Sequence, residues 1–86
     1  MKTVACTLMD VPNDDWLNGL EKQVLDEIRF QEAQCMSSDW EEDTAHRERI
    51  IKHHQSQWHE LRSWCNKKSK GEVCPPISVH FEFCAP

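Results

Sequence analysis

The sequence predicts an α+β domain of order β-α-α-β, in which two long antiparallel helices form a hairpin and the two ends of the chain form a small sheet. Apolar and polar residues alternate near both ends of the chain, as in strands. Two long segments between them carry apolar residues at helical spacing. The 86 residues include only two glycines, so few positions interrupt these helices. This length predicts a single domain spanning residues 1–86.

The first strand is predicted over about residues 3–11. Val4, Cys6 and Leu8 alternate with smaller or more polar residues, which gives the strand one more apolar face. Pro12 follows and ends it, because proline has no backbone N–H to donate.

The first helix is predicted over about residues 13–36. Asn13 is a favourable N-cap, and Asp14 and Asp15 fall in the first turn, where carboxylates complement the helix dipole. A stripe of apolar residues recurs at helical spacing: Leu17, Leu20, Val24, Ile28 and Cys35. Trp16 lies off this stripe, so we expect it to contact another element or a partner.

The second helix is predicted over about residues 39–70. Ser38 and Glu41 have the spacing of a capping box, which explains the acidic run over residues 39–43 as the start of a helix. Gly71 is the residue type that most often ends a helix. Lys67, Lys68 and Lys70 lie in the last turn, where positive charge is favourable.

One face of this second helix carries a seam whose residues recur at intervals of four and three. Its members are Trp40, Thr44, Arg47, Ile51, His54, Trp58, Leu61 and Cys65. This heptad spacing predicts packing against the first helix, with Trp40 and Trp58 in the core. We expect His54 to be a hydrogen-bonded polar position within the seam, and Arg47 to reach outward or pair with Glu27 or Glu32.

The last strand is predicted over about residues 76–84, where apolar and polar residues alternate strictly. Its apolar residues are Ile77, Val79, Phe81 and Phe83. The two terminal strands are expected to pair with each other. A sheet of two strands has two open edges, so either the edges stay short or a second copy of the chain completes the sheet as a homodimer.

The sequence predicts no catalytic, cofactor-binding or metal site. Five histidines and five cysteines are present, but none has the HExxH or CxxC spacing of a metal ligand set. Glycine-rich loops that cradle phosphate or support a nucleophile are also absent. We therefore expect a protein that is not an enzyme.

A cytoplasmic location is expected, without a membrane span. The five cysteines are odd in number and widely spaced, unlike a secreted disulfide framework, so we expect most of them to be reduced and buried. Asp10 interrupts the apolar N-terminal run before it reaches the length of a signal sequence.

Charge is unevenly distributed along the chain, with a net of −8 over residues 1–43 and +3 over residues 44–86. An acidic first helix with exposed tryptophans favours a protein-binding module. We expect an inhibitor or adaptor that binds a host protein, such as a nucleic-acid-processing enzyme whose basic groove attracts carboxylates. In its short length, acidity and lack of cofactor motifs, the chain resembles small accessory proteins of phages and mobile elements. The expected contact residues are Asp14, Asp15, Trp16, Glu41, Glu42, His53, Glu60 and Trp64. For Trp16 and Trp64, cover by the small sheet is the equal alternative.

Two alternatives use other residues. The basic end of the second helix could contact nucleic acid through Arg62, Lys67, Lys68 and Lys70, although a pI near 5.4 disfavours direct binding. A small domain held by zinc would instead draw its ligands from His59, Cys65, Cys74 or Cys84.

Overall fold

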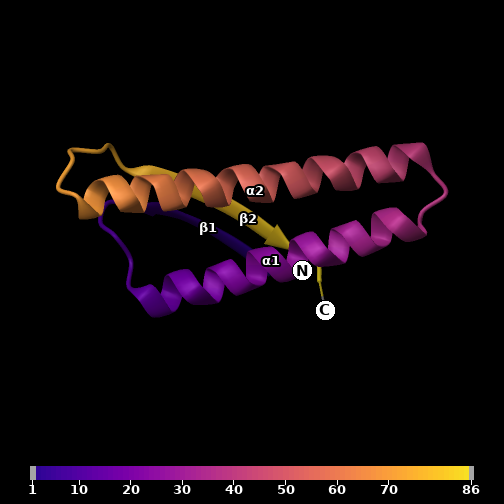
Figure 1. Ribbon diagram of the computed structural model, residues 1–86, viewed down its shortest axis with the longest axis horizontal. Helices are drawn as coiled ribbons and strands as arrows, with labels where there is room; N and C mark the ends of the chain where they lie inside the picture. Colours follow the sequence, from indigo (N-terminus) through magenta and orange to yellow (C-terminus); the bar gives the residue numbers. More distant parts are fainter. Residues whose placement is uncertain (1, 86) are drawn as a thin grey trace.

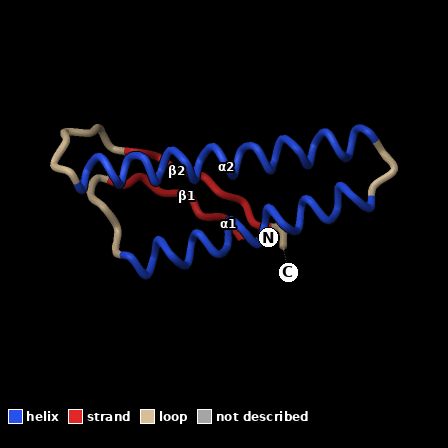
Figure 2. The backbone as a smooth tube through the Cα atoms, in the orientation of Figure 1, coloured by secondary structure: helices blue, strands red, loops and turns tan. Residues whose placement is uncertain are grey.

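The computed structural model describes residues 2–85 and has four elements (Figures 1 and 2). These are strand β1 (Lys2–Leu8), helix α1 (Asp14–Ser37), helix α2 (Glu41–Ser69) and strand β2 (Ile77–Phe83). The predicted α+β hairpin, with its two long helices and small sheet, is confirmed. Within the described part of the chain, no helix is long and apolar enough to cross a membrane.

The two strands pair antiparallel, from Lys2 opposite Phe83 to Leu8 opposite Ile77. The first strand is shorter than predicted, since it ends at Leu8 rather than near residue 11. Beyond Leu8 the opposite residues would be Pro76 and Pro75, and prolines have no N–H to continue the ladder. The position of Pro75-Pro76 therefore limits both strands.

The start of α1 is as predicted, because the Asn13 side-chain oxygen accepts the Trp16 N–H at 2.8 Å. The predicted capping box at α2 is wrong. The N–H of Ser38 still bonds to the carbonyl of Cys35 and closes α1, so Trp40 occupies the N-cap position of α2, without a side-chain cap. The Ser38 hydroxyl instead accepts the N–H of Trp40 itself, at 3.3 Å.

The end of α2 confirms the expected role of Gly71, which adopts a φ of +85°. Its N–H bonds to the carbonyl of Lys68, and the N–H of Glu72 bonds to that of Lys67. This pair of bonds is a Schellman motif, in which a left-handed residue turns the chain out of the helix. Glycine adopts that conformation without the steric cost of a Cβ.

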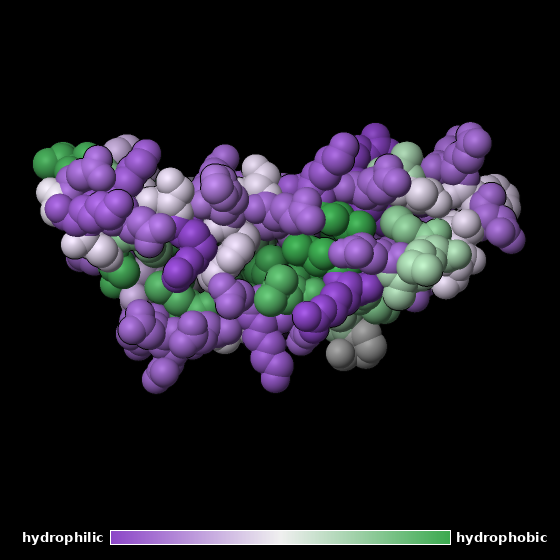
Figure 3. Space-filling model, viewed as in Figure 1, coloured by the Kyte–Doolittle hydropathy of each residue, from purple (hydrophilic) through white to green (hydrophobic). Residues whose placement is uncertain are grey.

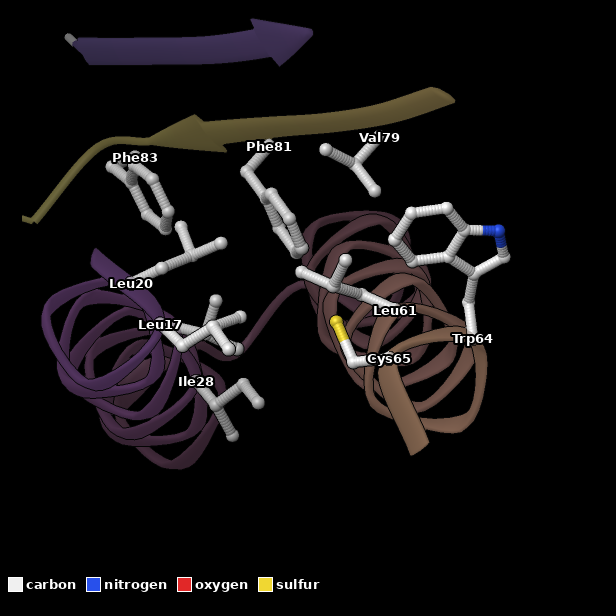
Figure 4. Close-up of a cluster of buried hydrophobic side chains, with 10 residues drawn as sticks. Leu17, Leu20, Ile28, Leu61, Trp64, Cys65, Val79, Phe81 and Phe83 are labelled. Atoms are coloured by element: carbon white, nitrogen blue, oxygen red, sulfur yellow. The ribbon is translucent and has the colours of Figure 1, made fainter. Parts of the chain in front are cut away.

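Hydrophobic side chains from α1, α2 and β2 meet in one core (Figure 4). Val79, Phe81 and Phe83 point from the strand toward the helices, as their alternation predicts. The other buried members lie on the helices: Leu17, Leu20, Val24, Ile28, Leu61, Trp64 and Cys65. The apolar stripe predicted for α1 is therefore confirmed, except that Cys35 is only half-buried.

The structure places Trp40 and Trp64 differently from the core and contact roles proposed for them from the sequence. Trp40 was expected in the core but is 75% exposed, because it precedes α2 and no third layer reaches that end of the hairpin. Trp64, which the sequence leaves open between an exposed contact and a residue covered by the sheet, is 7% exposed, and its indole N–H donates to the Pro75 carbonyl at 2.7 Å. Because α2 packs against β2 as well as α1, it buries a second stripe that a helix-pair seam does not include.

The helices are much longer than the sheet. At about 1.5 Å per residue α2 spans about 43 Å, whereas each strand spans about 23 Å. The molecule measures 48 × 21 × 17 Å, and the sheet covers only one half of the hairpin (Figure 1). The other half, which ends at the connection between the helices, projects beyond the sheet.

Candidate partner-binding surface

The projecting half of the hairpin is held together by polar contacts. Arg47 donates from Nε to Asp43 at 3.0 Å and from Nη1 to the side-chain oxygen of Gln31, on α1, at 2.9 Å. The expected pairing of Arg47 with Glu27 or Glu32 is therefore wrong, because Asp43 lies one turn away on the same helix. Cys35 adds a contact from its thiol to the Thr44 carbonyl at 3.8 Å.

The hydrogen bond from Arg47 lowers the pKa of the Asp43 carboxyl, with a further contribution from Ser38. A carboxyl with a lowered pKa stays ionised as the pH falls through its ordinary range. We therefore expect the Asp43–Arg47 pair to persist in mildly acidic solution. It is lost only when the pH falls through the lowered value, below the usual 3.8.

The polar contacts continue along the seam to a buried carboxylate that the sequence did not reveal. Glu27 is fully buried and accepts the backbone N–H groups of Cys84 and Ala85 at 2.5 and 3.1 Å. Gln31 lies within 3.5 Å of the same carboxylate. Glu27 thus attaches the chain that follows β2 to α1.

The outer edge of β2 is covered by side chains of α2. Gln57 accepts the N–H of His80 at 3.2 Å, and the Nε2 atom of His53 lies 3.0 Å from the His80 carbonyl. His54, which is buried as expected of a hydrogen-bonded seam residue, lies 2.8 Å from the Ile50 carbonyl and 3.0 Å from that of Glu82. The contacts with His80 and Glu82 satisfy backbone groups that an edge strand would otherwise leave unpaired.

A groove of about 390 Å³ lies beside this edge, lined by histidines and Arg49. Two of its histidines, His53 and His54, already hold β2 in place. Within residues 2–85, no three His, Cys, Asp or Glu side chains are grouped as metal ligands, so the zinc alternative gains no support.

All five cysteines are free thiols, but only Cys65 is buried and Cys84 is exposed, which corrects the expectation that most are buried. Burial raises the pKa of the Cys65 thiol.

The end of the hairpin combines large exposed apolar side chains with acidic ones. Met36 is 89% exposed and Trp40 is 75% exposed. Asp39, Glu41 and Glu42 are exposed beside them. A hollow of about 240 Å³ opens next to Trp40. We call this surface the tip, defined by Met36, Asp39, Trp40, Glu41 and Glu42.

The structure divides the predicted contact residues among separate places. Asp14, Asp15 and Trp16 begin α1, whereas Glu41 and Glu42 lie at the tip, about 36 Å away along a helix of 24 residues. His53 covers β2, and Trp64 is in the core, so its predicted role as an exposed contact is wrong. Glu60 is exposed and lines a hollow with His59 and Pro75, away from the tip.

Basic residues near the end of α2 lie against tryptophans. The guanidinium of Arg62 is 5.9 Å from the centre of the Trp58 ring, and the ammonium of Lys68 is 5.6 Å from that of Trp64. Such cation–π contacts explain the positions of both side chains within the fold. Figure 3 shows that hydrophilic side chains cover the outer sides of both helices, with hydrophobic ones in the seam between them.

Exposed apolar groups of this size are the feature that most clearly marks an interaction surface, since Trp and Met are enriched where proteins bind each other. At the tip, Met36 ends α1 and Trp40 precedes α2, both in the half of the hairpin that projects beyond the sheet. Trp16 also follows two exposed carboxylates, Asp14 and Asp15, but it is only 36% exposed, against 75% for Trp40. Comparison of the chain with protein-family models, with curated proteins and with solved structures found no match.

Proposed function

We propose that this protein is a non-enzymatic binding module whose tip docks onto another protein, as an inhibitor or adaptor. The observation that carries the proposal is Trp40, which exposes three quarters of its surface at the projecting end of the hairpin. A buried position for that indole is available only in a partner. Met36, four residues earlier at the end of α1, is also exposed, and its flexible thioether adapts to an apolar pocket.

The charge around Trp40 indicates the chemistry of the partner. Asp39 and Glu41 flank Trp40 in the sequence, Glu42 follows, and no Lys or Arg lies between residues 30 and 46. A complementary surface therefore has an apolar pocket with Lys or Arg at its rim. The basic groove of a nucleic-acid-processing protein is one surface of this kind, so we propose such a host protein as the partner.

The proposal is tested by capture from a host lysate with two matched double variants. Met36→Ala with Trp40→Ala removes the apolar part of the tip, whereas Leu25→Ala with Val73→Ala removes exposed apolar side chains elsewhere. We expect a protein captured by the wild type and by the control to be lost from the tip variant. With the purified pair, the tip variant should bind at least about 30-fold more weakly, the effect of removing one dominant contact residue. Equal capture by both variants would contradict the proposal.

A second prediction concerns the rate of association. Glu41→Lys with Glu42→Lys should slow binding to the captured partner at low salt by about tenfold or more, because carboxylates at the contact steer a basic partner. Asp14→Lys with Asp15→Lys is the matched control, since it makes the same charge change in the first turn of the other helix. Stopped-flow measurements at several salt concentrations compare the two. An equal effect of both variants would show that overall charge, rather than the tip, governs association.

A further inference from the structure

We infer that this chain forms a homodimer in which the β1 strands of two copies pair antiparallel and join their sheets into one of four strands. The starting observation is that, among the described residues, only one of the two edges of the sheet accepts or donates hydrogen bonds to another element. Side chains of α2 bond to the outer edge of β2 at His80 and Glu82. Within residues 2–85, no hydrogen bond from another element reaches the outer edge of β1.

The register between β1 and β2 determines which backbone groups of β1 point to the open edge. The N–H and C=O of His80 both point to α2, so His80 and its opposite residue Ala5 form a pair whose groups face away from each other. Along an antiparallel strand, the N–H and C=O groups of successive residues point alternately to one edge and to the other. The groups of Thr3, Ala5 and Thr7 therefore all point to the open edge. Six strong hydrogen-bonding groups are therefore available in one row.

The sequence of β1 is suited to pairing with itself. With Ala5 opposite Ala5 of a second copy, Thr3 faces Thr7 and Thr7 faces Thr3. Each of these pairs exchanges two hydrogen bonds, which satisfies all six groups. Lys2 is the only charged residue of β1 and faces Leu8 of the second copy, so like charges do not oppose each other. Apart from Lys2 at its start, the strand has no charged residue, and it contains no proline and no bulge in its pairing with β2.

The side chains of β1 support the same arrangement. Val4, Cys6 and Leu8 lie on the face that meets the core, yet they are only half-buried, because β1 lies beside β2 and not directly over a helix (Figure 4). A hollow of about 350 Å³ separates Val4 from Trp16 and Gly19 of α1. In the dimer, Val4 lies opposite Cys6 of the second copy, so the two half-buried rows join into one apolar face.

The oligomeric state tests this inference directly. Sedimentation equilibrium under reducing conditions, from about 10 to 500 µM, should give a mass approaching twice the 10.2 kDa of the chain. Ala5→Pro removes an N–H that β2 does not use, and proline is tolerated where the N–H faces outward. We expect this variant to keep its circular dichroism spectrum and to raise the dimer dissociation constant about ten- to a hundredfold. Ala5→Thr retains the N–H and should leave the constant within about threefold.

The register is tested by cross-linking. Val4→Cys should form a disulfide bond with Cys6 of the second copy under mild oxidation. Positions 4 and 6 would be opposite each other in a pair without mutual hydrogen bonds, where the two Cβ atoms lie close together. The peptide that joins residues 4 and 6 of two copies is identified by mass spectrometry, and Val4→Cys with Cys6→Ala should not yield it. A wild-type mass of 10.2 kDa throughout the concentration range would overturn the inference. A dimer that is unaffected by Ala5→Pro would overturn it as well.

Discussion

Phe81→Ala is expected to cost about 3–5 kcal/mol of unfolding free energy, because it removes a large side chain from the centre of the core and leaves a cavity. Phe81 is fully buried between the two helices, its ring is 6.0 Å from that of Phe83 and nearly parallel to it, and His54 lies 5.9 Å away. A domain of this length has a total stability of about 4–13 kcal/mol. The substitution should therefore remove a large share of this stability and lower the urea midpoint clearly.

Urea denaturation followed by far-ultraviolet circular dichroism measures this loss. Leu25→Ala is the control, since it also truncates a large apolar side chain but at a helical position that is 44% exposed. We expect the control to change stability by less than about 1 kcal/mol. Phe81→Leu should fall between the two, because it fills part of the cavity. A stable Phe81→Ala protein with an unchanged midpoint would show that β2 does not complete the core.

Glu27→Gln is expected to cost about 1.5–3 kcal/mol, although the two side chains have nearly the same shape. The carboxylate of Glu27 accepts the N–H groups of Cys84 and Ala85, one on each oxygen. A carboxamide offers one oxygen and one NH₂ group, so one backbone donor would face another donor. The substitution also replaces two charge-assisted bonds with, at most, one neutral bond.

The matched control for this prediction is Glu32→Gln, which makes the same change at an exposed position of α1. Its effect should stay within about 0.5 kcal/mol. Hydrogen exchange adds a local readout, because the amides of Cys84 and Ala85 should lose protection in Glu27→Gln before the rest of the sheet does. If Glu27→Gln and Glu32→Gln lower the unfolding free energy equally, the buried carboxylate does not hold the end of β2.

Residues whose partners lie nearby in the sequence were predicted well. Asn13 caps a helix that begins at the next residue, Gly71 follows the helix that it ends, and the alternation of Val79, Phe81 and Phe83 describes one face of one strand. In each case local spacing determines which groups are buried or bonded. Binary patterning of this kind was sufficient for the element order and for most of the core.

The residues that were misjudged depend on distant parts of the chain. Glu27 is acidic and would be placed on a solvated helix face, and only the approach of residues 84–85 supplies the donors that make its burial favourable. Trp64 is buried by β2 and Pro75, a layer that a two-helix pattern does not include. Trp40 continues the heptad spacing, but the helix starts after it. Of the tip residues, the sequence therefore predicts Glu41 and Glu42 as contacts but not Trp40.

The pairing of the two ends of the chain has a consequence for the order of folding. Leu8 and Ile77 are opposite each other, so the sheet can form only after nearly the whole intervening chain has closed into a loop. The helices are joined by a short connection and can associate early, because their contacts are local. During synthesis, β1 leaves the ribosome before α1, α2 and β2, and it has no strand partner until residues 77–83 emerge. The unpaired interval is when this strand is most exposed to association with the wrong chain.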